Sequence, residues 1–161
     1  MGVLDLCFDE KYIVSCSKDT TICVWERKTG LLLNRLRGHE GPVNAVQMRG
    51  NVLASASGDA TVKLWDLENG VCIKTLTGHT RGLACIQFSE DGKIIISGGN
   101  DQSIRVWNAE SGELKYEIPD AHKLLVRSLF LDSENNRIIS GSYDQVCIRF
   151  TRTLRFDSKA L

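Results

Sequence analysis

One short sequence pattern returns four times along the 161-residue chain. Its centre is an aspartate that is followed six residues later by an aromatic side chain. The four aspartates, spaced 40, 42 and 43 residues apart, are Asp19, Asp59, Asp101 and Asp144. The aromatic residues that follow them are Trp25, Trp65, Trp107 and Phe150. A repeat of this period predicts one supersecondary unit per copy, and such units bury their apolar faces only by stacking on one another.

Each copy contains short runs in which apolar and polar residues alternate, as they do in strands with one buried face. The third run alternates most cleanly, and its apolar pairs are Ile22/Val24, Val62/Leu64, Ile104/Val106 and Val146/Ile148. Turns that contain Gly30, Gly70 and Gly112 join the third run to the fourth, because glycine adopts a positive φ readily. We therefore expect an all-β chain with a single domain over 1–161. Its antiparallel four-stranded units should span about 2–37, 43–77, 83–119 and 125–157.

Composition and charge argue against several classes of function. The 20 basic and 20 acidic side chains cancel, which gives no support to general binding of nucleic acid or membranes. No apolar run approaches the ~18 residues of a membrane span, and no signal-peptide pattern opens the sequence. The six cysteines form no Cys-x-x-Cys pair, so we expect small apolar core thiols without metal or disulfide use. These features favour a cytosolic or nuclear location and predict no cofactor.

Three of the copies combine histidine, serine and aspartate, which is also the composition of a hydrolase triad. The combination recurs in copy after copy, whereas an active site occurs once. No Gly-x-Ser-x-Gly turn between a strand and a helix is present. The three histidines lie in different copies, without a Cys or a carboxylate at ligand spacing, which argues against a metal site. We therefore expect no catalytic residues and no enzymatic activity.

The marks Gly78-His79 and Trp65-Asp66, repeated at this period, resemble those of the WD-repeat family. The resemblance covers about residues 2–150 and implies a β-propeller built from four-stranded blades. Four blades are the lower limit for a closed propeller, and the family usually closes with about seven. We therefore expect part of a propeller or an open arc. Its two uncovered sheet faces predict a chain that is poorly soluble or oligomeric.

The same resemblance implies a structural role for the recurring polar residues. In each blade the histidine would bridge the serine and the aspartate, and the serine would accept the indole N–H, so that every buried polar group is paired. The expected sets are His39, Ser55, Asp59 and Trp65; His79, Ser97, Asp101 and Trp107; and His122, Ser140 and Asp144. The first copy has no Gly-His in this sequence, and Phe150 offers no N–H to Ser140. Blade four should therefore be looser.

A second set of residues belongs to the loops at one end of such a propeller. Just before the four aspartates stand Lys18, Gly58, Asn100 and Tyr143. Entering the first strands are Leu4, Asn44, Ala84 and Arg127, and just before two of these strands stand Arg81, Gly82 and Leu125. Arg127 is unusual, because a charge on an innermost strand costs desolvation unless a partner pairs with it. Basic side chains beside apolar and aromatic ones fit an extended anionic peptide.

Segments 12–19, 79–88 and 141–144 look like consecutive blades of F-box/WD-repeat proteins, most closely those of the β-TrCP group. That resemblance implies a propeller that binds phosphopeptide degrons for a ubiquitin ligase, with the eleven residues above in its pocket. Ala60 stands where that group often has arginine, and the sequence contains no F-box segment. The alternative is a generic WD-repeat scaffold that binds a partner protein without phosphate dependence. An enzyme is the remote third possibility.

Overall fold

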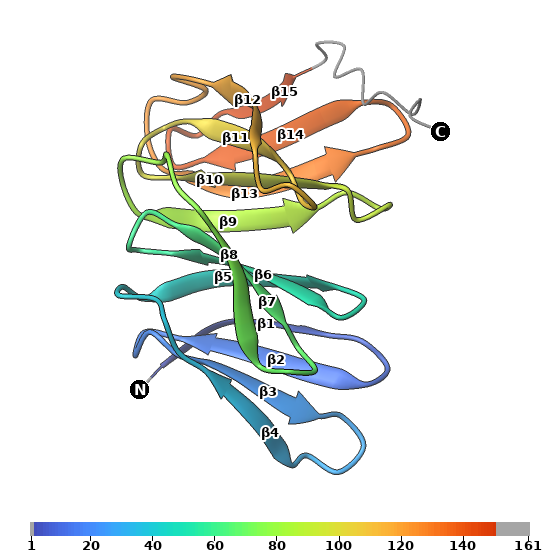
Figure 1. Cartoon of the computed structure of the whole chain (residues 1–161). Coiled ribbons are helices and arrows are strands. Elements are labelled where there is room, and N and C mark those ends of the chain that lie inside the picture. The colour runs from blue at the N-terminus through green and yellow to red at the C-terminus, as the bar shows by residue number, and fades with distance from the viewer. Residues whose placement is uncertain (1, 151–161) are drawn as a thin grey trace.

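Fifteen strands and no helix make up residues 2–150, the part of the chain that this computed structural model describes (Figure 1). The first eight are β1 (Val3–Phe8), β2 (Tyr12–Ser17), β3 (Ile22–Glu26), β4 (Leu32–Leu36), β5 (Val43–Arg49), β6 (Val52–Ser57), β7 (Val62–Asp66) and β8 (Val71–Leu76). The others are β9 (Leu83–Phe88), β10 (Ile94–Gly99), β11 (Ile104–Asn108), β12 (Leu114–Ile118), β13 (Val126–Asp132), β14 (Arg137–Ser142) and β15 (Cys147–Phe150).

Consecutive strands pair antiparallel and form four separate sheets, which we call blades one to four. The strand orders are β1-β2-β3-β4, β5-β6-β7-β8, β9-β10-β11-β12 and β13-β14-β15. The last part of the fourth unit expected at about 125–157, from residue 151 on, lies outside the described residues. Figure 1 shows the blades stacked in chain order, with blade one at the bottom and blade four at the top. The stack is open, so the all-β propeller arc expected from the repeat is confirmed.

Two kinds of turn join the strands within a blade. Gly30, Gly70 and Gly112 have φ of 71°, 69° and 80°, which confirms the positive φ expected between third and fourth strands. The residues after the repeated aspartates also have positive φ, and they are Thr20, Ala60, Gln102 and Gln145. Each of these aspartates accepts the backbone N–H two residues further on, as Asp59 does from Thr61 at 2.9 Å. This local bond fixes the turn without a glycine.

The hydrophobic core lies between blades and forms three clusters. Each blade turns one face, which we call its forward face, toward the next blade and its rear face toward the previous one. Val14 and Val24 on the forward face of blade one pack with Val46 and Trp65 on the rear face of blade two. The same arrangement repeats between blades two and three and between blades three and four. Stacking therefore buries the apolar faces, as the repeat predicts.

Two expectations about core residues were wrong in part. Val146 matches Ile22 in the repeat, yet it is 48% exposed, because it belongs to the forward face of blade four and no further blade covers it in the described residues. Cys16 and Cys85 are buried, and burial raises their pKa to about 12. Cys72 and Cys147, however, are exposed, and Cys72 lies on β8 at the outer rim of its blade.

Candidate functional site

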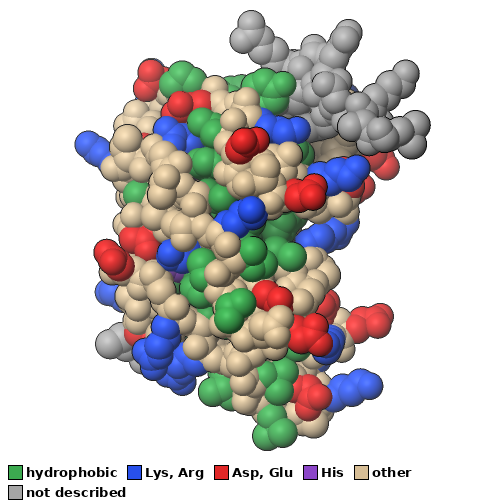
Figure 2. Space-filling view, in the orientation of Figure 1, with side chains coloured by type: hydrophobic (Ala, Val, Ile, Leu, Met, Phe, Trp, Pro, Cys, Tyr) green, Lys and Arg blue, Asp and Glu red, His purple; other side chains and the backbone are tan. Residues whose placement is uncertain are grey.

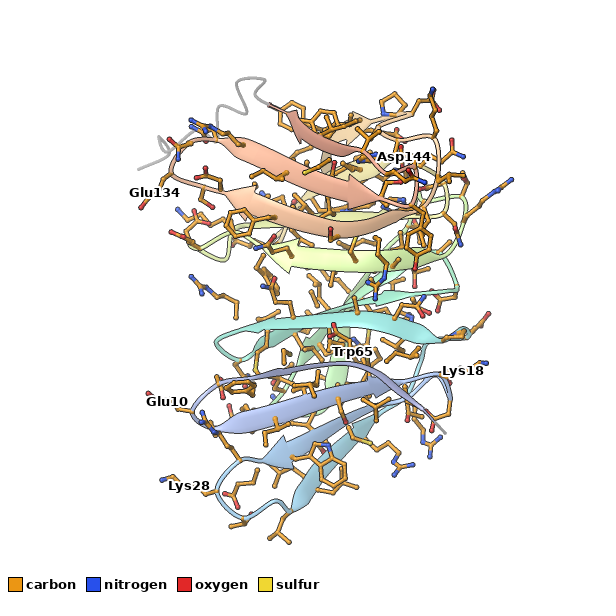
Figure 3. The ribbon with its side chains drawn as sticks, turned by 180° about the vertical axis from the view of Figure 1, so that it is seen from behind. Glu10, Lys18, Lys28, Trp65, Glu134 and Asp144 are labelled. Carbon is orange, nitrogen blue, oxygen red and sulfur yellow. The ribbon has the colours of Figure 1, made fainter. Side chains whose placement is uncertain are left out.

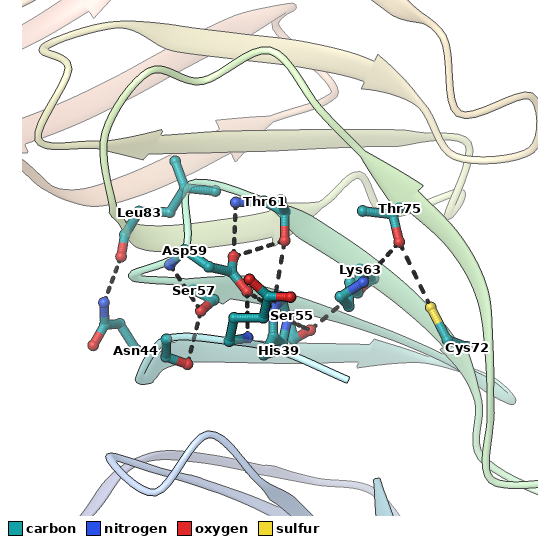
Figure 4. Close-up of polar contacts among 12 residues, drawn as sticks. His39, Asn44, Ser55, Ser57, Asp59, Thr61, Lys63, Cys72, Thr75 and Leu83 are labelled. Atoms are coloured by element: carbon teal, nitrogen blue, oxygen red, sulfur yellow. Dashed lines mark hydrogen bonds and ion pairs between the residues drawn. The ribbon is translucent and has the colours of Figure 1, made fainter. Parts of the chain in front are cut away.

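A chain of polar side chains runs through the rear half of blade two (Figure 4). His39 contacts Asp59 Oδ2 through Nδ1 and Ser55 Oγ through Nε2, both at 2.7 Å. The indole Nε1 of Trp65 donates to Ser55 Oγ at 2.8 Å. Blade three repeats these contacts at 2.7 and 2.8 Å with His79, Asp101, Ser97 and Trp107. The hydrogen bonds expected from the sequence are therefore present in both central blades.

The outer two blades hold incomplete versions of this network. In blade four His122 contacts Asp144 at 3.0 Å and Ser140 at 2.7 Å, and no indole is available because the aromatic position is Phe150. In blade one Trp25 donates to Ser15 at 3.1 Å, without a histidine. Throughout the described residues, every buried side-chain nitrogen and oxygen still has a partner.

Protonation follows from these contacts. Burial opposes ionisation of Asp59, but bonds from Thr61, the Glu40 N–H and His39 outweigh it, so its pKa is lowered to about 2. The pKa of Asp101 is likewise lowered to about 2. Burial lowers the pKa of His39, which keeps its ring neutral near pH 7. The carboxylate then accepts from Nδ1–H, and the serine hydroxyl donates to Nε2.

This network has the connectivity of a catalytic triad but not its accessibility. Ser55 and Ser97 are fully buried, and each oxygen already accepts an indole N–H. A substrate carbonyl cannot reach either hydroxyl. The network instead pairs buried polar groups and joins the loop before each first strand to the turn around its aspartate.

A different site is built where the first strands begin. In every blade the register of the first strand shifts by one residue against the second strand. The extra residues at these four β-bulges are Leu4, Asn44, Ala84 and Arg127. A bulge redirects the side chain of the extra residue and bends the strand. Bulges at equivalent places in four stacked blades therefore bring four residues that are about 40 positions apart into one region.

The same region is closed by a backbone bond that recurs in each blade. The residue before each repeated aspartate donates its N–H to the carbonyl of the residue that precedes the first strand. These bonds join Lys18 to Gly2 at 3.2 Å, Gly58 to Pro42 at 2.7 Å, Asn100 to Gly82 at 2.9 Å and Tyr143 to Leu125 at 3.2 Å. They hold the loop residues beside the bulges.

A cavity of about 370 Å³ lies on this side of the stack and is lined by residues of all four blades. Its lining consists of Leu4, Asn44, Gly58, Gly82, Leu83, Ala84, Asn100, Leu125, Arg127 and Tyr143. Nine of the eleven residues selected from the sequence thus line one cavity. The sequence did not indicate Leu83, because this residue contributes a backbone group to the site. Its carbonyl accepts from Asn44 Nδ2 at 2.7 Å, and no side-chain pattern signals that (Figure 4).

The other two selected residues, Lys18 and Arg81, do not line the cavity. Both are exposed. Figure 3 shows Lys18 and Asp144 on the same side of the stack, opposite the side on which Glu10 and Glu134 lie. Lys18 thus lies on the cavity side of the stack without lining the cavity. Arg81 also stays outside the lining, although it is next to Gly82, which belongs to it.

The glycines of the cavity have a packing reason that the sequence did not reveal. A Cβ on Gly82 would lie 3.0 Å from the Cα and the carbonyl oxygen of Gly58 in the preceding blade. Small residues such as Gly82 and Ala84 can also leave room for a bound peptide backbone. For Gly82 the structure shows instead that the backbones of neighbouring blades meet there.

Arg127 is the one charged side chain in the lining, which belongs entirely to described residues. A second cavity of about 180 Å³ follows the first strands and is also lined by Leu4, Asn44, Ala84 and Arg127. It adds Asp5, whose Oδ2 accepts the N–H of Val46 at 3.0 Å. Arg127 is exposed, and the other residues that line the larger cavity are uncharged.

Residues 2–150 contain no cluster of three His, Cys, Asp or Glu side chains that is arranged to hold a metal ion. Within the same range there is no helix with the length and apolar character needed to cross a membrane.

The family model described as "WD domain, G-beta repeat" matches residues 2–26, 30–66 and 70–108. These segments make up more than half of the chain, so the protein belongs to the WD-repeat family. Members of this family are in general non-enzymatic scaffolds that bind other proteins. The chain is thus a WD-repeat propeller segment with a protein-interaction fold.

Individual relatives agree with this assignment. Autophagy-related protein 16 of Arabidopsis thaliana is 33% identical over 160 residues, which cover 95% of this chain and 31% of that protein. The WD40 beta propeller domain of Doa1 superposes with a TM-score of 0.82 at 29% identity, over 94% of this chain and 51% of that chain. The computationally designed Ika4 protein gives 0.85 at 32%, over 92% and 90%. The chain spans less than a third of the length of the curated relatives it matches.

Proposed function

We propose that the chain binds a short, extended peptide segment in the cavity beside the four β-bulges. The segment would carry a phosphorylated or otherwise anionic side chain. The observation that carries this proposal is the convergence of four β-bulges, with Arg127 as the charged member, on one cavity of about 370 Å³. Cavities of this size suit a few residues of a ligand.

The lining supplies a complementary group for each part of such a peptide. The planar guanidinium of Arg127 offers paired donors to phosphate or carboxylate oxygens, a geometry that lysine lacks. Asn44 uses its Nδ2 for Leu83, so its Oδ1 remains as the acceptor for a peptide N–H. Leu125 and Tyr143 provide an apolar and aromatic surface for a neighbouring side chain.

The distribution of charge favours binding of an anion on the cavity side of the stack. Exposed Lys18 and Arg81 lie near the cavity and would attract an anion before it docks. A cavity elsewhere, between the turns after β9 and β13, is lined by Glu90, Asp91 and Glu134 and would repel an anion.

The finer proposal is a degron-binding part of an F-box/WD-repeat substrate receptor, acting in the cytosol or the nucleus. It rests on the resemblance of the cavity residues to the β-TrCP group. Ala60 removes one donor expected in that group, so we expect weaker phosphate binding than the full set would give. A generic scaffold that ignores phosphate is the competing function.

Titration calorimetry can separate these two functions. The chain is titrated with a doubly phosphorylated Asp-Ser-Gly-x-x-Ser peptide and with its unphosphorylated twin. We expect tighter binding of the phosphorylated peptide and a loss of about tenfold or more in Arg127→Ala, because a charge-assisted bond contributes about 1.5–3 kcal/mol. Arg127→Lys should recover only part of the loss. Arg81→Ala should have a smaller effect that disappears at high salt.

Arg49→Ala is the matched control, because Arg49 is exposed and lines a cavity outside this site. It should bind the phosphopeptide as the unaltered chain does. Equal affinity for both peptides, or unchanged affinity in Arg127→Ala, would leave the generic scaffold as the better explanation.

A further inference from the structure

The rear face of blade one consists of residues that the other blades bury. Val3, Leu6 and Phe8 on β1 are 61%, 56% and 61% exposed. Their counterparts at the same strand positions of blade three, which are 1%, 9% and 5% exposed, are Leu83, Ile86 and Phe88. The difference has a simple cause: blade two covers these residues of blade three, whereas no sheet within residues 2–150 covers blade one from behind. Apolar side chains also reach the surface over the lowest sheet in Figure 2.

The forward face of blade four is exposed in the same way. Phe130 on β13 is 55% exposed, and Ile139 and Ile148 are only half-buried. Their partner Val146 is 48% exposed, although the equivalent residues of the other three blades are completely buried. Those equivalents are Ile22, Val62 and Ile104.

These two faces are the two halves of one kind of joint. At each of the three internal joints, a forward face like that of blade four packs on a rear face like that of blade one. The two faces lie at opposite ends of the stack, so one molecule cannot join them (Figure 1). Apolar faces of this kind bind a complementary surface in water.

We propose that two copies of the chain close head to tail, with the forward face of blade four on the rear face of blade one of the other copy at both joints. The arc has the shape of part of a solved propeller. The chain superposes on 51% of a solved propeller chain with a TM-score of 0.82, so two copies together have about the length of that chain. A heterologous contact closes into a ring when the rotation between copies permits it, and two four-bladed arcs stay within the size range of propellers.

One position distinguishes the new joint from the internal ones. Inside the chain, Gln87 on β9 accepts the N–H of Leu131 on the next blade at 2.8 Å, and Gln47 accepts that of Phe88. In blade four the position of these glutamines is held by Phe130, and in blade one the position of Phe88 is held by Phe8. The joint between copies would therefore bring Phe130 against Phe8 and replace a polar tie by an aromatic contact.

Light scattering after size exclusion tests this closure. We expect a mass of twice 17.9 kDa for the unaltered chain at micromolar concentration. Phe8→Lys and Phe130→Glu should each give a single-chain mass. An equimolar mixture of the two variants should regain the double mass, because it restores one native joint and pairs Lys with Glu at the other. Ile73→Lys, at an equally exposed position on rim strand β8, should remain double.

Circular dichroism of each variant shows whether the blades stay folded, and both phenylalanines are on the surface of the single chain. A single-chain mass for the unaltered protein would overturn the proposal and favour further blades of a longer polypeptide as the covering surface. A dimer that tolerates one of the two substitutions would indicate a contact between like faces. Larger assemblies would indicate an open head-to-tail chain, and either result would overturn the closed pair.

Discussion

The hydroxyl of Ser55 is the common partner of two buried side chains. It lies 2.8 Å from the indole nitrogen of Trp65 and 2.7 Å from Nε2 of His39. In Ser55→Ala both groups lose this partner, and a buried polar group left unpaired costs about 1–3 kcal/mol. We expect chemical denaturation to show a loss in unfolding free energy of about 2–4 kcal/mol, because two buried groups lose a partner at once.

Ser140→Ala is the matched control for this change. Ser140 is as buried as Ser55 but bonds only His122, because Phe150 has no N–H. The loss in unfolding free energy of Ser140→Ala should be about half that of Ser55→Ala. Equal losses in the two variants would show that the indole bond contributes nothing.

The histidine–aspartate pairs make stability depend on pH. Asp59 and Asp101 have pKa values of about 2 when folded, against 3.8 ordinarily. Between about pH 4 and pH 2 the unfolded chain therefore binds protons that the folded chain does not, so stability falls as the pH drops through this window. Burial also lowers the pKa of His39 below its ordinary 6.5, so a first loss should begin as the pH falls below that value.

Denaturant midpoints measured from pH 8 to pH 2 check this dependence. We expect a plateau above about pH 6.5, a shallow decline below it and a steeper one below about pH 4. A midpoint that stays constant between pH 4 and pH 2 would contradict the assignment of Asp59 and Asp101 as ionised partners in the folded state.

At the scale of strands, single side chains tie one blade to the next. Gln87 on β9 accepts the N–H of Leu131 on the inner edge of β13. In Gln87→Leu this N–H loses its partner, so hydrogen–deuterium exchange of Leu131 and its neighbours in β13 should become faster. Amides of β2 should exchange as before, because each repeat contacts mainly its neighbours. A uniform rise across all blades would indicate global destabilisation instead.

The strands themselves were well predicted because their signals are local. Alternating apolar residues and the glycines of the turns predicted four-stranded units at 43–77 and 83–119, and the strands of blades two and three lie within these bounds. The β-bulges at Asn44 and Arg127 have no local signal of this kind in the sequence. An extra residue in one strand depends on the register of its partner, and the expected two-residue alternation continued through both positions.

At the scale of the whole molecule, the repeat period predicted the stack of four sheets and the resemblance selected most of the cavity. The resemblance implied that Lys18 and Arg81 belong to the same pocket, whereas neither of them lines the cavity. Their actual positions depend on how the loops of neighbouring blades pack, as where the backbone of Gly58 meets Gly82. The exposure of Val146 likewise depends on which face has a neighbour, which no single repeat reveals.

The order of the strands also determines how such a chain can fold. Each of the fifteen described strands pairs only with strands adjacent in sequence, so each sheet can form over a short stretch of chain, with little loop-closure entropy. On a ribosome, blade one can form while later blades are still being synthesised, and each new blade then covers the forward face of the one before it. Folding would proceed in one direction along the chain. The newest blade of the nascent protein would expose its apolar forward face until the next blade covers it.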